Sequence, residues 1–173
     1  ILCIPPYTSS EGVDVALIAE AAAYCERRRA MLLVDPPPNW KSKTTAKNEF
    51  SDPNDKVGTR SRNAALFFPR ITKSNPLHDN QLEDFVPCGT VAGIFARTDT
   101  QRGVWKAPAG LDAALVDAPK LSVPLTDDEN GLLAHISMWG SDGYPIKRIG
   151  RGWSWSFRGI AGPPVVFKTK RAA

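Results

Sequence analysis

The sequence lacks any apolar run of the roughly 18 residues that a membrane-spanning helix requires. Its longest apolar stretches are broken within a few positions by proline, arginine or aspartate, which excludes a transmembrane protein. The chain begins at Ile1 and shows no basic stretch followed by an apolar one. We therefore expect no signal peptide, and a chain that begins inside a longer protein.

Residues suited to catalysis and to metal or nucleotide binding are also scarce. The only histidines are His78 and His135, and no motif places a nucleophile or a carboxylate beside either. No HExxH, paired CxxC, aspartate-rich calcium loop, P-loop or GxGxxG motif is present. Pro36, Pro37 and Pro38 stand where a phosphate-binding loop would follow a strand, and they carry no N–H donors. We predict no catalytic residue, no metal site and no cofactor.

Cysteine is rare and charge is unevenly placed. Cys3, Cys25 and Cys88 have no metal-binding spacing, so we expect reduced, partly buried thiols in a cytoplasmic product. The net charge is +4, yet residues 1–138 hold 15 basic and 17 acidic residues, whereas residues 139–173 hold seven basic residues and one acidic residue. A nearly neutral body has no field to steer nucleic acid along its length, so we expect no such partner for it.

Residues 1–138 show an α/β pattern, in a chain whose 173 residues favour one domain or one domain with an appendage. Apolar runs at 1–4 and 31–34, each closed by a polar residue or prolines, predict buried strands. Between them, Thr8 and Glu11 form a capping-box pattern that predicts a helix ending at three arginines. The three elements together predict a βαβ unit. The apolar positions at helical spacing are Val13, Leu17, Ala21 and Tyr24.

The next segments are more polar. Residues 39–62 predict a mobile surface excursion with one helical turn, because they carry few large apolar side chains. Residues 63–68 predict a third strand. Residues 71–84 predict a loop around Asn75 and Pro76.

A long helix is predicted at residues 89–102, ending at Gly103. An extended piece at 121–125 follows, and Thr126 with Glu129 predicts the start of another helix. The apolar side of the long helix is formed by Val91, Ile94, Phe95 and Thr98.

The composition shifts in residues 139–173, where glycine and arginine rise and three of the five tryptophans lie. Trp153, Trp155 and Phe157 alternate as on one face of a strand, and Val165–Phe167 is a second candidate strand. Aromatic rings among arginines are also typical of nucleic-acid or membrane-surface binding, which stays an alternative for this segment. We therefore separate an irregular, basic, Trp- and Gly-rich tail from the α/β domain.

Several motifs stand in order along residues 1–138. They are Ile4-Pro5, Ala23-Tyr24-Cys25, Leu33-Val34-Asp35-Pro36, Asn63 to Pro69, Val86 to Gly89, Val91 to Asp99, Arg102 to Ala109 and Val123 to Asp127. Together they resemble the tail sheath proteins of contractile phages. The matching region is similar to the subtilisin-like domain of those proteins. This resemblance implies a βαβ-containing layered sheet with flanking helices.

The resemblance implies a mechanical function. Sheath subunits assemble as hexameric rings in a helical lattice around an inner tube, and contraction of the lattice drives the tube through a cell envelope. The implied partners are other sheath subunits and the inner tube protein, with no small-molecule substrate and no membrane insertion. The implied location is the tail of a virion or injection particle whose subunits are made in the bacterial cytoplasm. A phage, a bacteriocin-like particle and another injection system stay open.

A hydrolase built on a subtilisin-like body is the alternative function. Val91, Ala92 and Gly93 are similar to the run that follows the nucleophile of subtilisin-type proteases, but residues 84–89 contain no serine. Cys88 would need a base, which only a distant histidine offers, and an oxyanion hole. We therefore expect a protein that is not an enzyme.

Five residues are candidates for a contact between subunits, because they mix charge with one large aromatic ring in a family-like motif. In the other interpretation Trp105 packs on its own domain and the charges are solvated or pair internally. Both interpretations stay open here. The candidates are Arg97, Asp99, Arg102, Trp105 and Lys106.

The sequence departs from the family past about Asn130. Family members continue into a strand ending in Trp-Gly-Ala-Arg and then a domain that meets the inner tube, whereas here Trp139 and Gly140 precede Ser141 and Asp142. We expect a truncated member of the family. A frame-shifted reading frame or a divergent short relative would produce the same departure.

Overall fold

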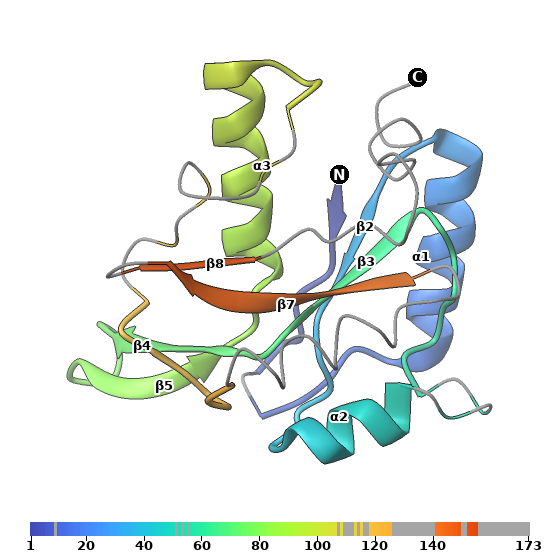
Figure 1. Cartoon of the computed structure of the whole chain (residues 1–173). Coiled ribbons are helices and arrows are strands. Elements are labelled where there is room, and N and C mark those ends of the chain that lie inside the picture. Colours follow the sequence, from blue (N-terminus) through green and yellow to red (C-terminus); the bar gives the residue numbers. More distant parts are fainter. Residues whose placement is uncertain are drawn as a thin grey trace.

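The computed structural model describes residues 1–8, 10–50, 52, 54, 56–106, 108, 113, 115, 118–125, 141–149 and 152–155. Figure 1 shows a sheet with α3 on one side and α1 and α2 on the other. The elements are β1 (Leu2–Cys3), α1 (Val15–Arg28), β2 (Leu32–Val34), α2 (Lys43–Phe50), β3 (Ala64–Phe68), β4 (Ile71–Asn75), β5 (Gln81–Phe85), α3 (Cys88–Arg102), β6 (Lys120–Leu121), β7 (Ser141–Ile149) and β8 (Gly152–Trp155).

The main sheet has five strands in the order β1-β2-β3-β7-β8. β1, β2, β3 and β7 pair in parallel, and β8 returns antiparallel to β7. The predicted βαβ unit is confirmed, because α1 connects the parallel strands β1 and β2. β7 joins this sheet from beyond residue 138, so the sheet continues across the change in composition. The division into two domains stays a prediction.

Two apolar clusters cover the two faces of the sheet. The strands β2 and β3 are buried on both faces, as expected of central parallel strands. Leu33 and Phe67 pack with Phe95 of α3 on one face. Leu32 and Leu66 pack on the other face with residues of α1 and α2. Alternate side chains of each strand therefore pack against the helices on opposite faces of the sheet.

Helix α1 begins later than the capping box predicts, and the face that it buries against the sheet differs from the predicted apolar face. Asp14 is the N-cap, and its Oδ1 accepts hydrogen bonds from the backbone N–H of Ala16 (2.7 Å) and Leu17 (3.3 Å). Thr8 closes only a turn before the helix, where its carbonyl accepts from the Glu11 N–H. Small residues let the helix approach the sheet closely, so they form the buried face in place of the larger apolar side chains. The buried residues are Ala21, Ala22 and Cys25, while Leu17 and Tyr24 are 45% and 48% exposed.

The segment at 39–62 is anchored in the core, which corrects the expected surface excursion. It carries the eight-residue helix α2, whose Phe50 is buried together with Trp40 and Val57. The Trp40 ring meets the Phe50 ring edge-on, and its Nε1–H donates to Glu49 (2.7 Å). Three apolar anchors spread among polar residues are enough to fix the segment.

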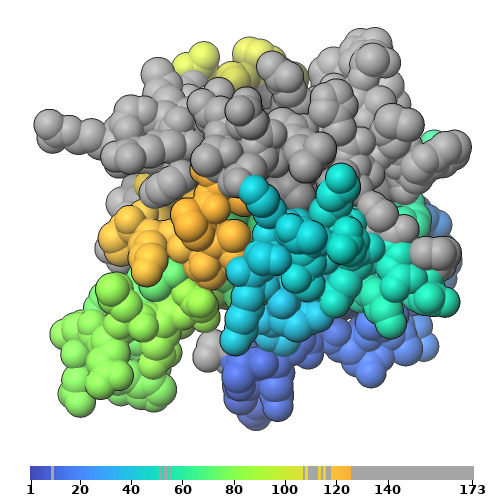
Figure 2. Space-filling model, turned by 60° about the horizontal axis from the view of Figure 1, so that its bottom comes forward, coloured from blue at the N-terminus to red at the C-terminus, as the bar shows by residue number. Residues whose placement is uncertain are grey.

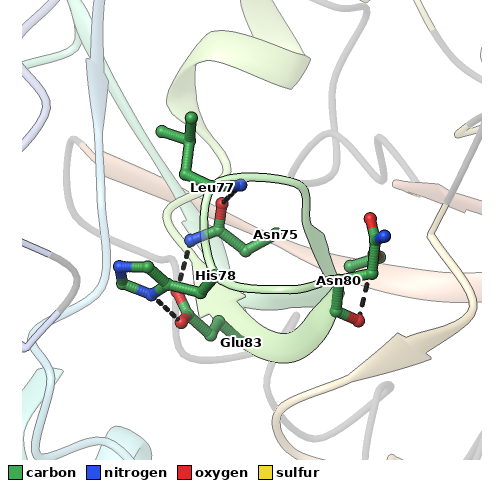
Figure 3. A network of polar contacts seen from close by, with 6 residues as sticks. Asn75, Leu77, His78, Asn80 and Glu83 are labelled. Atoms are coloured by element: carbon green, nitrogen blue, oxygen red, sulfur yellow. Dashed lines mark hydrogen bonds and ion pairs between the residues drawn. The ribbon is translucent and has the colours of Figure 1, made fainter.

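Residues 71–85 form a hairpin, so the predicted loop is wrong. β4 pairs antiparallel with β5 on one side and with β6 on the other. The turn is held by Asn75, whose side chain accepts from the Leu77 N–H (3.0 Å) and donates to Glu83 (2.8 Å) (Figure 3). His78 lies in this turn, with Nδ1 2.5 Å from Glu83 Oε1. Side-chain hydrogen bonds thus stabilise strands whose sequences show no alternation of apolar and polar residues.

Helix α3 matches its prediction closely. Val91, Ile94, Phe95 and Thr98 are all buried, and the helix ends before Gly103, whose N–H bonds to the Asp99 carbonyl (3.1 Å). Cys25 and Cys88 are buried and Cys3 is half-buried, and all three thiols are free, as predicted. β8 contains Trp153 and Trp155. The helix predicted at Thr126–Glu129, the residue Phe157 and the strand Val165–Phe167 lie outside the described residues.

Candidate subunit-interface site

The five predicted contact residues gather at the carboxyl end of α3. Arg97, Asp99 and Arg102 lie on the last turns of the helix, and Trp105 and Lys106 follow in a tight turn. The turn is closed by the Lys106 N–H, which donates to the Gly103 carbonyl (3.1 Å). Figure 1 shows this end of α3 pointing away from the hairpin.

Trp105 is 76% exposed and therefore does not pack into its own domain. Its neighbour Val104 is 58% exposed. Gly103 adopts a φ of +88°, and a Cβ there would lie 2.8 Å from the indole Nε1, so glycine permits this position of the ring. This exposure argues against the interpretation in which Trp105 is an internal packing residue, and the role of Trp105 in a contact between subunits stays a prediction.

The charged candidates differ in exposure. Arg102 is exposed, whereas Arg97, Asp99 and Lys106 are half-buried. All four take part in interactions within the chain. The surface around Trp105 thus combines an exposed aromatic ring with charged side chains that already interact within the chain.

The opposite end of α3 is buried and tied to the sheet. The Cys88 N–H at the start of the helix donates to Asp35 Oδ1 (2.8 Å), and Asp35 directly follows β2. Cys3, at the end of β1, donates from Sγ to the Cys88 carbonyl (3.7 Å). These contacts join the carboxyl ends of two parallel strands to one helix.

The electrostatics at Cys88 oppose nucleophilic chemistry by this thiol. The hydrogen bond with Cys3, followed by burial and the nearby Asp35, raises the pKa of the Cys88 thiol. Burial also raises the pKa of Asp35, although its hydrogen bonds from Cys88 act in the other direction. A cysteine nucleophile requires a lowered pKa or an adjacent base. His78 instead lies in the hairpin turn, bonded to Glu83.

A cleft of about 400 Å³ opens beside Asp35 at the carboxyl ends of the parallel strands, the usual place for ligands in open α/β sheets. Its wall includes Arg70, which is buried and donates from Nη2 to the carbonyls of Pro36 (3.2 Å) and Glu11 (3.0 Å). Arg70 therefore fastens the proline loop to the segment before α1. Because these hydrogen bonds go to backbone groups, they assign the side chain a structural role.

The described part of the chain contains neither a metal-binding cluster nor a membrane-spanning helix. Among its residues, no three histidine, cysteine, aspartate or glutamate side chains lie close enough together to hold a metal ion. None of the helices in the described part combines the length and apolarity that a bilayer crossing requires.

The described elements define a layered α/β fold, with helices on both faces of a largely parallel sheet. Chains of two solved structures share this fold. A chain in the anti-feeding prophage (AFP) baseplate structure aligns with a TM-score of 0.57 at 22% identity, covering 82% of this chain and 32% of that chain. A chain of the contracted AFP helical sheath aligns with a TM-score of 0.55 at 22% identity, covering 81% of this chain and 34% of that one.

A third similar structure is the contracted sheath complex PVC of an extracellular contractile injection system, with a TM-score of 0.49, 22% identity, and coverage of 72% and 31% of the two chains. No family model and no curated protein matches the chain. The predicted resemblance to contractile sheath proteins is confirmed, as a likeness of fold, by the AFP sheath structure. The chain spans about a third of the length of the chains that it matches.

Sequence reasoning missed two features of this architecture. Asp35 follows an apolar strand directly, which is a sequence signal for a side chain at the sheet edge, but its partner Cys88 lies 53 positions away. Arg70 follows β3 after the single residue Pro69 and anchors a distant loop. Both contacts depend on the order of strands, which local patterns do not give.

Proposed function

We propose that this chain is a structural subunit, or part of one, of a contractile sheath that polymerises around an inner tube. The observation that carries the proposal is the fold likeness to a chain of the contracted AFP sheath over 81% of this chain. In such a lattice, repeated head-to-tail contacts produce a helix of subunits. Small rotations at every contact add up to a large shortening.

The exposed Trp105 supports assembly rather than a solitary domain. Large aromatic side chains are enriched among the residues that dominate binding between proteins. Here the ring stands on a rigid helix end and has charged residues around it. We propose that this end of α3 contacts a neighbouring sheath subunit, with Trp105 as the anchor.

Further parts of the proposal extend beyond the matched third of those longer chains. They are the contact with the inner tube protein, the hexameric rings, the contraction that drives the tube through an envelope, the location in a particle tail and synthesis in the bacterial cytoplasm. The subtilisin-like description of the body and a separate basic C-terminal segment also belong to the proposal. The raised pKa of Cys88 disfavours the hydrolase alternative.

Immunogold electron microscopy tests the proposal on particles from the source culture. Antibodies against a peptide of residues 97–110 should label contractile tails in a regular axial repeat, and an excess of the free peptide should abolish the label. A mass measurement of the purified particles then distinguishes this chain from a longer sibling. Label confined to soluble protein would contradict the proposed function.

A further inference from the structure

The hairpin β4–β5 carries an exposed apolar and acidic surface. Leu77 at its turn is 88% exposed and Leu82 on β5 is 62% exposed. Asp84 lies two residues after Leu82, so both side chains are on the same face of the strand. Asp79 is exposed in the turn. Figure 2 shows the hairpin, in light green, projecting from the body.

The hairpin surface is ordered before any partner binds. Glu83 faces the other side of β5, where it accepts from Asn75 and contacts His78 (Figure 3). Lys73, the cation opposite Glu83 in the strand register, lies over the Phe85 ring at 5.0 Å. Asp84 accepts a hydrogen bond from Thr72 (2.5 Å) and interacts electrostatically with Arg70 of the same chain. A carboxylate has about four acceptor sites, so Asp84 can accept a further hydrogen bond.

Helix α1 carries an exposed surface of the opposite charge. Leu17, Tyr24 and Arg28 follow one another at intervals of seven and four residues, so they form one stripe along the helix. Leu17 and Tyr24 make the stripe apolar and Arg28 makes its carboxyl end basic, while the exposed Glu20 flanks it one turn before Tyr24. That end is strongly cationic, since further exposed arginines adjoin it in Arg27, Arg29 and Arg62.

The two surfaces match in spacing as well as in charge. Tyr24 and Arg28 are separated by about 6 Å along the helix axis, from a rise of 1.5 Å per residue. Leu82 and Asp84 are separated by about 7 Å along the strand, from a rise near 3.4 Å per residue. Leucine can therefore lie against tyrosine while aspartate pairs with arginine.

These surfaces lie at opposite corners of the molecule. Figure 1 shows the hairpin at the lower left and the basic end of α1 at the upper right. One chain thus cannot bring its own hairpin to its own α1. Two different surfaces of the same chain that fit each other produce a head-to-tail contact, which repeats from copy to copy.

We propose that the α1 stripe of one chain binds the β4–β5 hairpin of a second copy of this chain. In this contact Leu82 packs against Tyr24, and Asp84 pairs with Arg28. The contact is distinct from the Trp105 surface. It rests on the proposed sheath function and adds to it the surface that joins successive subunits.

Complementation between two charge-reversed full-length chains tests this contact. Asp84→Arg and Arg28→Asp each place like charges opposite one another in a self-contact, so each variant alone should self-associate at least about tenfold more weakly than wild type. In an equimolar mixture, Arg28 of the Asp84→Arg chain can pair with Asp84 of the Arg28→Asp chain. The introduced arginine of the first chain can likewise pair with the introduced aspartate of the second, so every contact can join opposite charges. The mixture should therefore recover association to within about threefold of wild type.

Arg27→Asp is the matched control, because it makes the same charge reversal on the same helix about 100° around the axis from Arg28. It should change association by less than about threefold. Association is measured by analytical ultracentrifugation, and circular dichroism shows that each variant is folded. Tubular polymers are sought in the same samples by electron microscopy.

The outcomes separate the two proposals. Recovery in the mixture without tubular polymers supports the contact and counts against the sheath function for this chain. Polymers, or any association, that neither reversal weakens would overturn the contact and leave the sheath function standing. The absence of self-association in wild type would overturn both. Weakening by Arg27→Asp equal to that by Arg28→Asp would overturn the assigned pairing.

Discussion

The two ends of α3 have opposite environments although they belong to one continuous helix. At its start, Cys88 is buried and bonded to Asp35, and one turn further Val91 is buried against the sheet. At its end, Arg102 and Trp105 are exposed. The amino end is fixed by contacts within the chain, whereas the carboxyl end offers a large aromatic side chain to the surroundings.

This difference separates stability from assembly along a single element. Changes near the sheet should act on folding, because buried side chains lose packing when they are truncated. Changes beyond Gly103 should act on association, because exposed side chains contribute little to folding. Four variants test this division.

Phe95→Ala should have the largest effect on folding. The ring is 1% exposed and packs with Leu33 and Phe67 of the sheet, so its removal should lower the free energy of unfolding by about 3–5 kcal/mol. Urea titration followed by circular dichroism measures the loss. Leu77→Ala, at an exposed apolar side chain, should cost less than about 0.5 kcal/mol. Equal losses in the two variants would contradict the assignment of the core.

The buried side of α3 is the part that the sequence predicts best. Val91, Ile94, Phe95 and Thr98 recur at helical spacing, and the helix has a single apolar side, so the pattern identifies the buried face. Helix α1 has apolar residues on more than one side. There the close approach of Ala21 and Ala22 to the sheet decides which face of the helix is buried. A pattern that ignores the size of the side chains predicts the wrong face.

The hairpin and the polar contacts of Asp35 could not be predicted from local patterns. β5 alternates Leu82 and Asp84 with Glu83, without an apolar face, because most of the strand is not covered by the core. Asn75 and Glu83 meet only after the turn has closed. The contact residues at 97–106 could be proposed from their composition, but the exposure of Trp105 depends on the turn at Gly103.

Trp105→Ala should leave folding intact and weaken assembly. Its free energy of unfolding should change by less than about 0.5 kcal/mol because the ring is exposed. If the ring anchors a contact between subunits, association should lose about 2 kcal/mol or more per contact. Ultracentrifugation and urea titration measure the two quantities. Tyr7→Ala, at a fully exposed aromatic residue away from α3, is the control and should alter neither. A loss of stability without a loss of association would return Trp105 to an internal role.

Gly103→Ala tests the junction between the buried helix and the exposed ring. A φ of +88° with ψ of 158° is a conformation that essentially only glycine adopts, so alanine should cost about 1–3 kcal/mol of stability. Its Cβ would also displace the Trp105 ring. Gly89→Ala is the matched control in the first turn of the same helix, where an added Cβ meets nothing within 4 Å. That variant should be neutral or stabilise by up to about 1 kcal/mol. Similar destabilisation by both substitutions would show that the junction has no special conformation.

Asp35→Asn tests the buried end of α3 through pH and should produce the smallest effect. Burial raises the pKa of Asp35 in the folded protein above its ordinary value of about 3.9. The folded state therefore binds this proton more tightly than the unfolded state, so the contribution of Asp35 to stability is present below about pH 3.9 and is lost as the pH rises through the raised pKa. Asparagine does not titrate, yet it can still accept the hydrogen bond from the Cys88 N–H. All other titrating groups are the same in wild type and variant, so only Asp35 makes the difference in their unfolding free energies depend on pH. As the pH rises from about 3.9 through the raised pKa, wild type should lose stability relative to the variant. Above that range the difference should be constant. Urea titrations at intervals from about pH 3 to about pH 8 measure this difference. A constant difference throughout would mean that Asp35 is as well solvated as the exposed Arg102 near Trp105, and the contrast between the two ends of α3 would then rest on packing alone.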